Sequence, residues 1–152
     1  MFSQRIRSVM EHDAPPTAAP QSTVSEASRM MATSRINAVL VIEGEQLLGI
    51  FTSGDAVRRV LAKGLDASST RVADVMTAPV RTVHPEWTFG RALKIMHEHD
   101  LRQVPVVEGG KPIGILCARD ALDPEMEEFA CEAQRRVAFS TDPAEDRPAG
   151  KR

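Results

Sequence analysis

Two short segments of the chain place an aspartate three residues after a small side chain, where an aliphatic run meets a predicted helix. They are Thr52–Asp55 and Cys117–Asp120. An aspartate at such a point can accept hydrogen bonds from both hydroxyls of a ribose, and a threonine hydroxyl can bind ribose or phosphate. Free N–H groups at the start of a helix favour a nearby phosphate. The same pattern in Thr52–Asp55 could instead be a capping box that only starts the helix.

The second segment helps to choose between these readings. Cys117 takes the place of the threonine and caps a helix poorly, yet Asp120 is still present. The comparison favours ligand binding over capping alone. Cys117 could be a redox-sensing thiol, but we prefer to interpret it as a small buried residue.

The sequence gives little support to an enzyme. The phosphate-binding pattern G-x-x-x-x-G-K-[ST], the dinucleotide pattern G-x-G-x-x-G, the hydrolase pattern G-x-S-x-G and the zinc pattern H-E-x-x-H do not occur. His97 and His99 are two residues apart on a predicted helix, so they point to different faces and form no metal pair. The two cysteines, Cys117 and Cys131, lack the spacing of a zinc site. We expect a binding protein without catalysis or metal.

The elements that must position these residues occur twice, because the chain repeats itself. From Pro15 to Val57, thirteen positions are identical to those 65 residues later, without a gap. Thr17 corresponds to Thr82 in this alignment. Upstream, Val9 and Met10 match a second Val-Met pair at an offset of 66. The repeated unit has about 50 residues.

Each copy predicts an extended segment, a helix, a β-hairpin and a closing helix. Thr23–Glu26 has the form of a capping box and begins the first helix. The aliphatic runs Val39–Ile42 and Leu47–Phe51 predict the two strands of the hairpin. The closing helix is expected over Asp55–Lys63 and ends at Gly64. Its apolar side would contain Val57, Val60 and Leu61.

The same patterns divide the chain into four parts. We expect the first copy with a lead-in helix over residues 1–65 and the second copy over 66–123. A C-terminal helix is predicted over 124–139, because acidic residues come early and arginines late. The polar composition of 140–152 predicts a flexible tail.

Composition excludes several classes of protein. The 152 residues are 42% hydrophobic and 26% charged, as in ordinary globular proteins. Nineteen Lys and Arg against twenty-one Asp and Glu give a formal charge of −2, so there is no basic excess to bind a phosphate backbone, and we do not expect nucleic-acid binding. The longest aliphatic run, Ala38–Ile42, is too short for a membrane helix, and no secretory signal is recognised. We expect a cytoplasmic protein.

The duplicated unit resembles the cystathionine-beta-synthase (CBS) domain. The best-matching strings are Leu101–Val107 and Gly49–Asp55, with Val75–Thr77 at the start of the second copy. The resemblance covers about residues 8–122. It implies an α/β fold of two tandem CBS repeats, each β-α-β-β-α, related by a pseudo-twofold axis. Members of this family bind AMP, ADP, ATP, NAD or S-adenosylmethionine between the repeats, commonly dimerise, and are usually sensors.

The resemblance also implies roles for individual residues. Thr52 and Asp55 match positions that bind ribose, and Arg102 matches a basic residue that reaches phosphates, where the first copy has Asn37. Thr17 matches a position beside the adenine. Surface arginines are often simply solvated, and edge-strand threonines or buried strand valines would look alike in sequence. The candidate binding residues are Thr17, Val39, Thr52, Asp55, Thr82, Arg102, Val104, Pro105, Arg119 and Asp120, with Val39 and Val104 expected on the pocket floor.

The expected function is regulatory. An adenine nucleotide, AMP, ATP or NAD, would change the packing of a homodimer or of an unknown effector protein. The alternative is an interaction scaffold whose clefts stay empty. We expect the two sites to differ, because Cys117 lacks a hydroxyl and because Pro15 and Pro16 should prevent a regular strand ladder at the start of the first copy.

Overall fold

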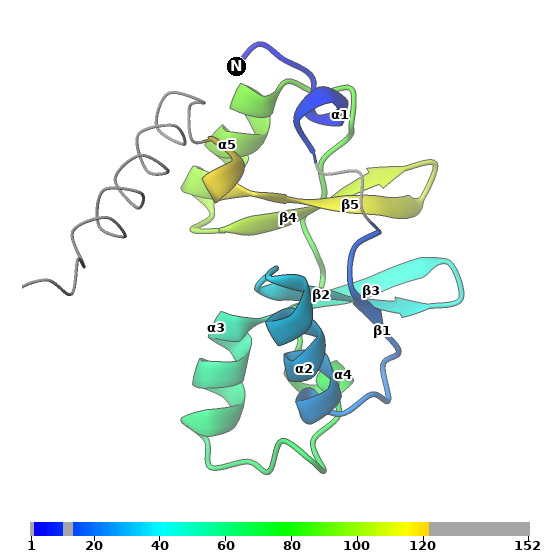
Figure 1. The fold of residues 1–152 in the computed structure, drawn as a ribbon, viewed down its shortest axis with the longest axis vertical. Coiled ribbons are helices and arrows are strands. Elements are labelled where there is room, and N and C mark those ends of the chain that lie inside the picture. Colours follow the sequence, from blue (N-terminus) through cyan, green and yellow to red (C-terminus); the bar gives the residue numbers. More distant parts are fainter. Residues whose placement is uncertain (1, 11–13, 122–152) are drawn as a thin grey trace, which may run out of the picture. The chain divides into compact units, whose positions relative to one another are not determined.

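The computed structural model describes residues 2–10 and 14–121, and residues 1–120 form one compact unit (Figure 1). The helix predicted over 124–139, the tail predicted over 140–152 and Cys131 lie outside the described residues. The elements are α1 (Ile6–Val9), β1 (Thr17–Ala18), α2 (Val24–Ser34), β2 (Ala38–Glu43), β3 (Gln46–Thr52), α3 (Ser53–Asp55), η1 (Ala56–Leu61), α4 (Val72–Val75), α5 (Phe89–Glu98), β4 (Gln103–Glu108), β5 (Lys111–Cys117) and η2 (Ala118–Ala121).

Each copy contains the predicted antiparallel hairpin. Strand β2 pairs with β3 and β4 pairs with β5, and the register shifts by one residue after Val41 in the first hairpin and after Val106 in the second. The turns contain Gly44 and Gly109, at φ 62° and 58°, a left-handed conformation that glycine adopts without steric cost. The duplication is therefore reproduced in the backbone down to the bulge.

The opening strand of the first copy contradicts the sequence expectation. Strand β1 pairs in parallel with β2, with Thr17 opposite Leu40 and Ala18 opposite Val41. In the second copy, the parallel pairing is a single bridge between Val83 and Val106. The expectation that the prolines would prevent this pairing was wrong, because a proline still offers its carbonyl: the N–H of Leu40 donates to the carbonyl of Pro16 at 2.9 Å.

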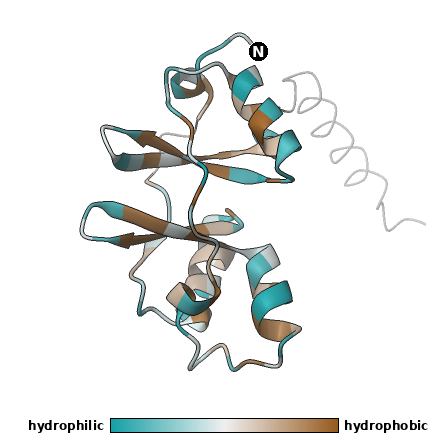
Figure 2. Cartoon of the chain, turned by 180° about the vertical axis from the view of Figure 1, so that it is seen from behind, coloured by the Kyte–Doolittle hydropathy of each residue, from teal (hydrophilic) through white to brown (hydrophobic). Residues whose placement is uncertain are grey.

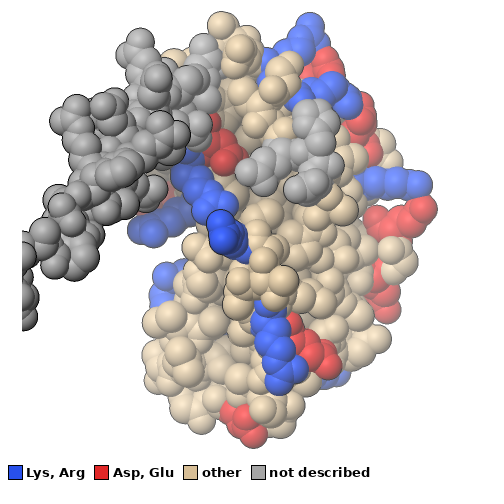
Figure 3. All heavy atoms as spheres, viewed as in Figure 1, with Lys and Arg blue, Asp and Glu red and all other residues tan. Residues whose placement is uncertain are grey.

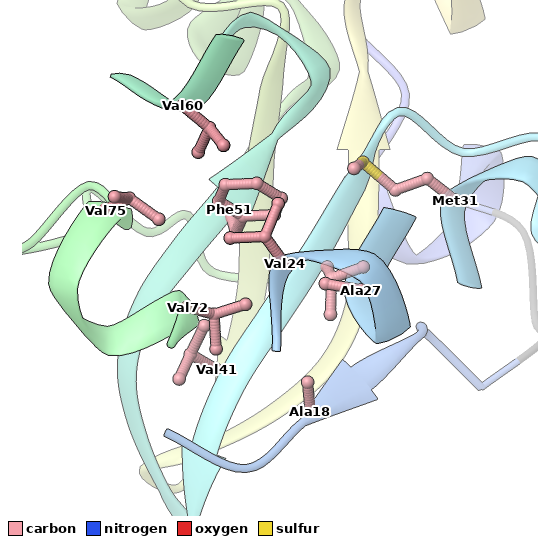
Figure 4. Close-up of a cluster of buried hydrophobic side chains, with 10 residues drawn as sticks. Ala18, Val24, Ala27, Met31, Val41, Phe51, Val60, Val72 and Val75 are labelled. Atoms are coloured by element: carbon pink, nitrogen blue, oxygen red, sulfur yellow. The ribbon is translucent and has the colours of Figure 1, made fainter. Parts of the chain in front are cut away.

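Strand residues alternate between two apolar layers. Val39, Val41 and Phe51 pack with the helices of the first half, as Figure 4 shows for Val41 and Phe51 with Val24 of α2 and Val72 of α4. The opposite face packs the first hairpin against the second through the side chains of Ala38, Leu40, Ile50, Ile115 and Cys117. Figure 2 shows hydrophobic residues along both hairpins. The two copies therefore share a core.

The segments that precede each first strand are exchanged between the halves. Helix α1, from the N-terminus, packs beside α5 of the second copy: Ile6 is fully buried and its N–H donates to the carbonyl of Trp87 at 2.9 Å. Helix α4 packs on the first copy, where the N–H of Val72 donates to the carbonyl of Ser22 at 2.8 Å. Each packed half thus contains the lead-in of the other copy.

The closing helix of the first copy begins with α3 and continues as η1, a segment of π-helix. It starts at Ser53, two residues before the predicted start, and Gly64 follows it at φ 67°. Val60 is buried, whereas Val57 is 56% and Leu61 70% exposed. The expectation that all three lie on one buried side was wrong, because the wider π-helical turn rotates Val60 away from the other two.

Candidate functional site: clefts between the two copies

Asp55 is the buried carboxylate of the first copy, with only 3% of its surface exposed. The backbone N–H of Thr52 donates to its Oδ2 at 3.0 Å, and the N–H of Asp55 donates to the Thr52 hydroxyl at 3.2 Å. These two bonds form a capping box. The capping interpretation of this segment is therefore confirmed, while ribose binding by the same carboxylate stays a prediction.

Two further groups hold this carboxylate from outside its own turn. The Thr77 hydroxyl lies 3.2 Å from Oδ1, and Nε of Arg59 lies 3.5 Å from the same oxygen. Arg59 also donates from Nη1 to the carbonyl of Met76 at 2.8 Å. Asp55 thus ties its helix to the segment that leads into the second copy, and its orientation is fixed before any ligand arrives.

Asp120 has a similar position at the end of β5. The backbone N–H of Cys117 donates to its Oδ2 at 2.7 Å. The Cys117 residue is 7% exposed and packs in the layer between the hairpins. Its burial agrees with the interpretation of Cys117 as a small packing residue.

A polar cavity of about 570 Å³ lies at the first aspartate. Thr52 and Asp55 line it from the first copy, Thr77 from the linking segment and Arg102 from the second copy. Arg58 and Asp100 add one charge of each sign. The structure thereby brings Thr52, Asp55 and Arg102 to one cavity, whereas the sequence grouped Arg102 with Asp120. Its other lining residues are Asn37, Ile50, Ser53, Gly54, Leu101 and Gln103.

A smaller cavity of about 300 Å³ lies at the start of η2. Arg119 lines it together with Arg102, Cys117, Ala118, Asn37 and Gln103. The guanidinium of Arg119 donates to the carbonyl of Arg35 at 3.1 Å, across to the first copy. Figure 3 shows Lys and Arg side chains on the hollowed edge of the molecule.

Thr17 lines neither of these cavities. It belongs to a third one, of about 620 Å³, formed by the end of α2 and the residues before β1. Apolar side chains of Met30 and Ile36 line it beside the cation Arg29 and the hydroxyl of Thr33.

Four predicted residues are placed elsewhere. Val39 and Val104 are fully buried, and Val39 packs in the helix-side core. The expectation that Val39 forms a pocket floor was wrong, because strand alternation turns it away from the second copy. Pro105 is buried in β4 and its carbonyl accepts the N–H of Val83 at 3.0 Å. Thr82 is exposed and lines none of the three cavities.

Sequence reasoning missed Thr77, Asp100 and Gln103 as lining residues. Thr77 could have been found from the Val-Met-Thr string at the start of the second copy. Asp100 and Gln103 lie close to Arg102 in sequence, between α5 and β4. At such a junction, the sequence pattern does not predict which way a side chain points. Asp100 has φ 52°, a left-handed conformation that aspartate tolerates better than most residues.

An ion cluster lies where α1 packs on the second copy. The side chains of Arg5 and Arg7 both pair with Glu86, and Arg7 also pairs with Glu108. Hydrogen bonds from Arg7, and then from Arg5, lower the pKa of Glu86 below its ordinary value of 4.5. The hydrogen bond to Glu86 raises the pKa of Arg7. This cluster connects the exchanged lead-in to its host and contributes nothing to the cavities.

Across residues 2–10 and 14–121, no cluster of three or more His, Cys, Asp or Glu side chains is arranged to hold a metal ion. No helix in that part of the chain has both the length and the apolar character of a membrane span.

The comparison with known proteins agrees with this architecture. A mitochondrial CBS domain-containing protein of Arabidopsis thaliana, CBSX3, is 33% identical over 122 residues, which are 77% of this chain and 59% of that protein. The chain therefore spans less than two thirds of this relative. A putative signal-transduction protein with CBS domains from Burkholderia ambifaria has a TM-score of 0.70 at 30% identity, over 85% of this chain and 93% of that one.

A CBS domain protein from Pyrobaculum aerophilum, solved in complex with AMP, has a TM-score of 0.73 at 19% identity and covers 85% of this chain and 99% of its own. That likeness concerns the fold. The CBS domain family itself matches residues 6–62 and 72–125, most of the chain. The chain belongs to the CBS domain family and contains two tandem CBS domains.

Proposed function

We propose that this CBS domain pair is a regulatory module that binds an adenosine-containing nucleotide and catalyses no reaction. The observation that carries the proposal is the 570 Å³ cavity, in which a hydroxyl and a carboxylate of one copy face a guanidinium of the other. Thr52 and Asp55 offer oxygens to ribose hydroxyls, and Arg102 offers a cation to phosphate. The Pyrobaculum relative, whose fold is the same, binds AMP.

A second nucleotide would use the smaller cavity. There Arg102 and Arg119 supply positive charge. Asp120, the counterpart of Asp55, is not one of its lining residues, but it accepts the N–H of Cys117, which is. The apolar side chains of Met30 and Ile36, in the cavity that Thr17 lines, suit a base. Because Cys117 offers no hydroxyl, this site should bind ribose more weakly than the first.

Calorimetry with AMP, ADP, ATP, NAD and S-adenosylmethionine tests the proposal and identifies the ligand. A ligand at 100 times its Kd should also raise the free energy of unfolding by about 2.7 kcal/mol. Asp55→Asn should weaken binding at least tenfold, whereas Glu98→Gln, the same change on an exposed carboxylate of α5, should leave it unchanged. If none of the five compounds binds, the chain is a scaffold and the proposal fails.

We further propose that the module forms a homodimer through an apolar strip on its first closing helix. The strip consists of Val57, Leu61 and Leu65, which are 56%, 70% and 46% exposed. Val57 and Leu61 lie four residues apart on the helix, Leu65 follows just after Gly64, and large exposed apolar side chains are costly to leave in water. Leu61→Glu should shift the mass measured by light scattering from dimer to monomer, and the neighbouring exposed substitution Ala62→Glu should not. A monomeric wild-type chain would refute this assembly.

Ligand binding would act on this assembly through differential affinity. A nucleotide changes packing only if it binds one arrangement of the copies or subunits better than another. Asp55 provides such a connection, because it touches both the larger cavity and Thr77 of the linking segment. An effector protein would respond to the resulting change in packing.

A further inference from the structure

The larger and the smaller cavity are not separate, because they share lining residues. Asn37, Arg102 and Gln103 line both the 570 Å³ and the 300 Å³ cavity. Of these three shared side chains, Arg102 alone carries a charge. Its side chain is exposed and therefore able to turn toward either cavity.

Positions 37 and 102 are equivalent in the two copies. The carbonyl of Asn37 accepts the N–H of Ser53 at 3.1 Å, and the carbonyl of Arg102 accepts the N–H of Ala118 at 2.8 Å. Each residue is thus fixed against the start of its own closing segment. The duplication would allow a cation at both positions, but this chain has a guanidinium at one and an uncharged amide at the other.

The remaining cations do not replace Arg102. In the larger cavity, Arg58 and Asp100 contribute one charge of each sign, and the carboxylate of Asp55 already pairs with Arg59. In the smaller cavity, the guanidinium of Arg119 already donates to the carbonyl of Arg35. Arg102 is therefore the cation that lines both cavities, and a phosphate in either one can bind it.

We propose that Arg102 serves as a phosphate-binding residue for both sites and makes their occupancies antagonistic. The inference rests on the proposed nucleotide function and concerns its regulation. A phosphate that engages Arg102 from one cavity leaves the other cavity with less positive charge. The second phosphate is also repelled by the first, because both would lie at one side chain, within the Debye length of about 8 Å at physiological salt. Binding in one cavity should weaken binding in the other about tenfold, within the usual range of coupling between sites.

Calorimetry with AMP on the full chain measures this coupling. The wild type should show two binding events of different affinity. Asp55→Asn disables the larger cavity, so the Kd of the remaining site should be about tenfold lower than that of the weaker wild-type event. Adenosine, which has no phosphate, should show no such gain. Thermal unfolding without nucleotide confirms that each variant is folded.

A gain-of-cation variant tests the residue itself. Asn37→Arg places a second guanidinium at the equivalent position, and the weaker AMP event should tighten about tenfold toward the stronger one. Arg102→Gln should weaken AMP binding at both sites, whereas Arg81→Gln, at an exposed arginine that lines neither cavity, should change neither.

The outcomes separate this inference from the proposed function. Two AMP sites that bind independently, or an Asn37→Arg chain whose weaker site is unchanged, would overturn the shared role of Arg102 and leave nucleotide binding intact. A chain that binds neither AMP nor adenosine would refute nucleotide sensing, and the inference with it.

Discussion

Replacing Gly49 with alanine should destabilise the protein, although the residue lies in a strand where alanine is normally acceptable. A Cβ at this position would lie 2.4 Å from Sδ of Met76, 2.9 Å from its Cγ and 3.0 Å from the carbonyl oxygen of Thr77. Thr77 cannot move freely, because it exchanges two backbone hydrogen bonds with Ile50, at 2.8 and 3.0 Å. Overpacking of this kind costs about 1–3 kcal/mol.

The second copy supplies the matched control. A Cβ at Gly114 would lie 2.4 Å from Cε of Met10 and 3.9 Å from its Sδ. The close atom is the end of a flexible side chain, so a rotamer change relieves the contact. Reduced entropy of the unfolded chain also favours alanine by about 0.4–1 kcal/mol. Gly114→Ala should therefore cost less than about 1 kcal/mol.

Urea unfolding of both variants measures the difference. Met76→Ala in the Gly49→Ala background should recover part of the loss, since it removes two of the three close atoms and leaves the Thr77 carbonyl. The coupling in this double-mutant cycle should be at least about 0.5 kcal/mol. Equal costs for Gly49→Ala and Gly114→Ala, or the absence of coupling with Met76, would show that the linking segment yields and that this packing argument is wrong.

Three other substitutions test separate parts of the structure. Ile6→Ala should cost about 2–5 kcal/mol in urea unfolding, because the side chain is fully buried against the second copy; a cost under 1 kcal/mol would contradict the exchange of lead-in segments. Thr77→Val should cost about 1–3 kcal/mol by removing a donor to a buried carboxylate, and exposed Thr33→Val should cost much less. Glu86→Gln should lower stability at pH 7, and its deficit relative to wild type should shrink as the pH falls below 4.5, since a lowered pKa stabilises the folded state only while the carboxylate is ionised. A deficit independent of pH would rule out the ion cluster as its cause.

The internal repeat made most of the fold predictable. Alternating aliphatic runs and glycine turns recur at a fixed offset, so the hairpins at 38–52 and 103–117 could be placed from the sequence. The same signal located the capping box at Thr52 and Asp55. Local pattern was sufficient here because hydrogen bonds between residues three apart decide the structure of such a turn.

Two features could not be found in this way. The exchange of α1 and α4 depends on which half each lead-in packs against, and equivalent segments of a duplicated chain fit either half by local criteria. The burial of residues on the closing helix also differed from the prediction, because the π-helical turn changes which residues share a face. Such a turn has no signature in the sequence. Both failures concern long-range packing or helix geometry, not the identity of the elements.

The two copies agree where the fold requires it and differ where the cavities lie. Gly49 and Gly114 both lie under a methionine, and the aspartates of both copies accept a backbone N–H. At the cavities, Asn37 of the first copy corresponds to Arg102 of the second, and Thr52 corresponds to Cys117. Because the backbones of the two hairpins match, a difference in binding between the cavities must come from these side chains. Exchanging the residues at 37 and 102 should therefore leave the fold intact. The nucleotide affinities of the two sites should then change in opposite directions only as far as Thr52 and Cys117 make the sites different.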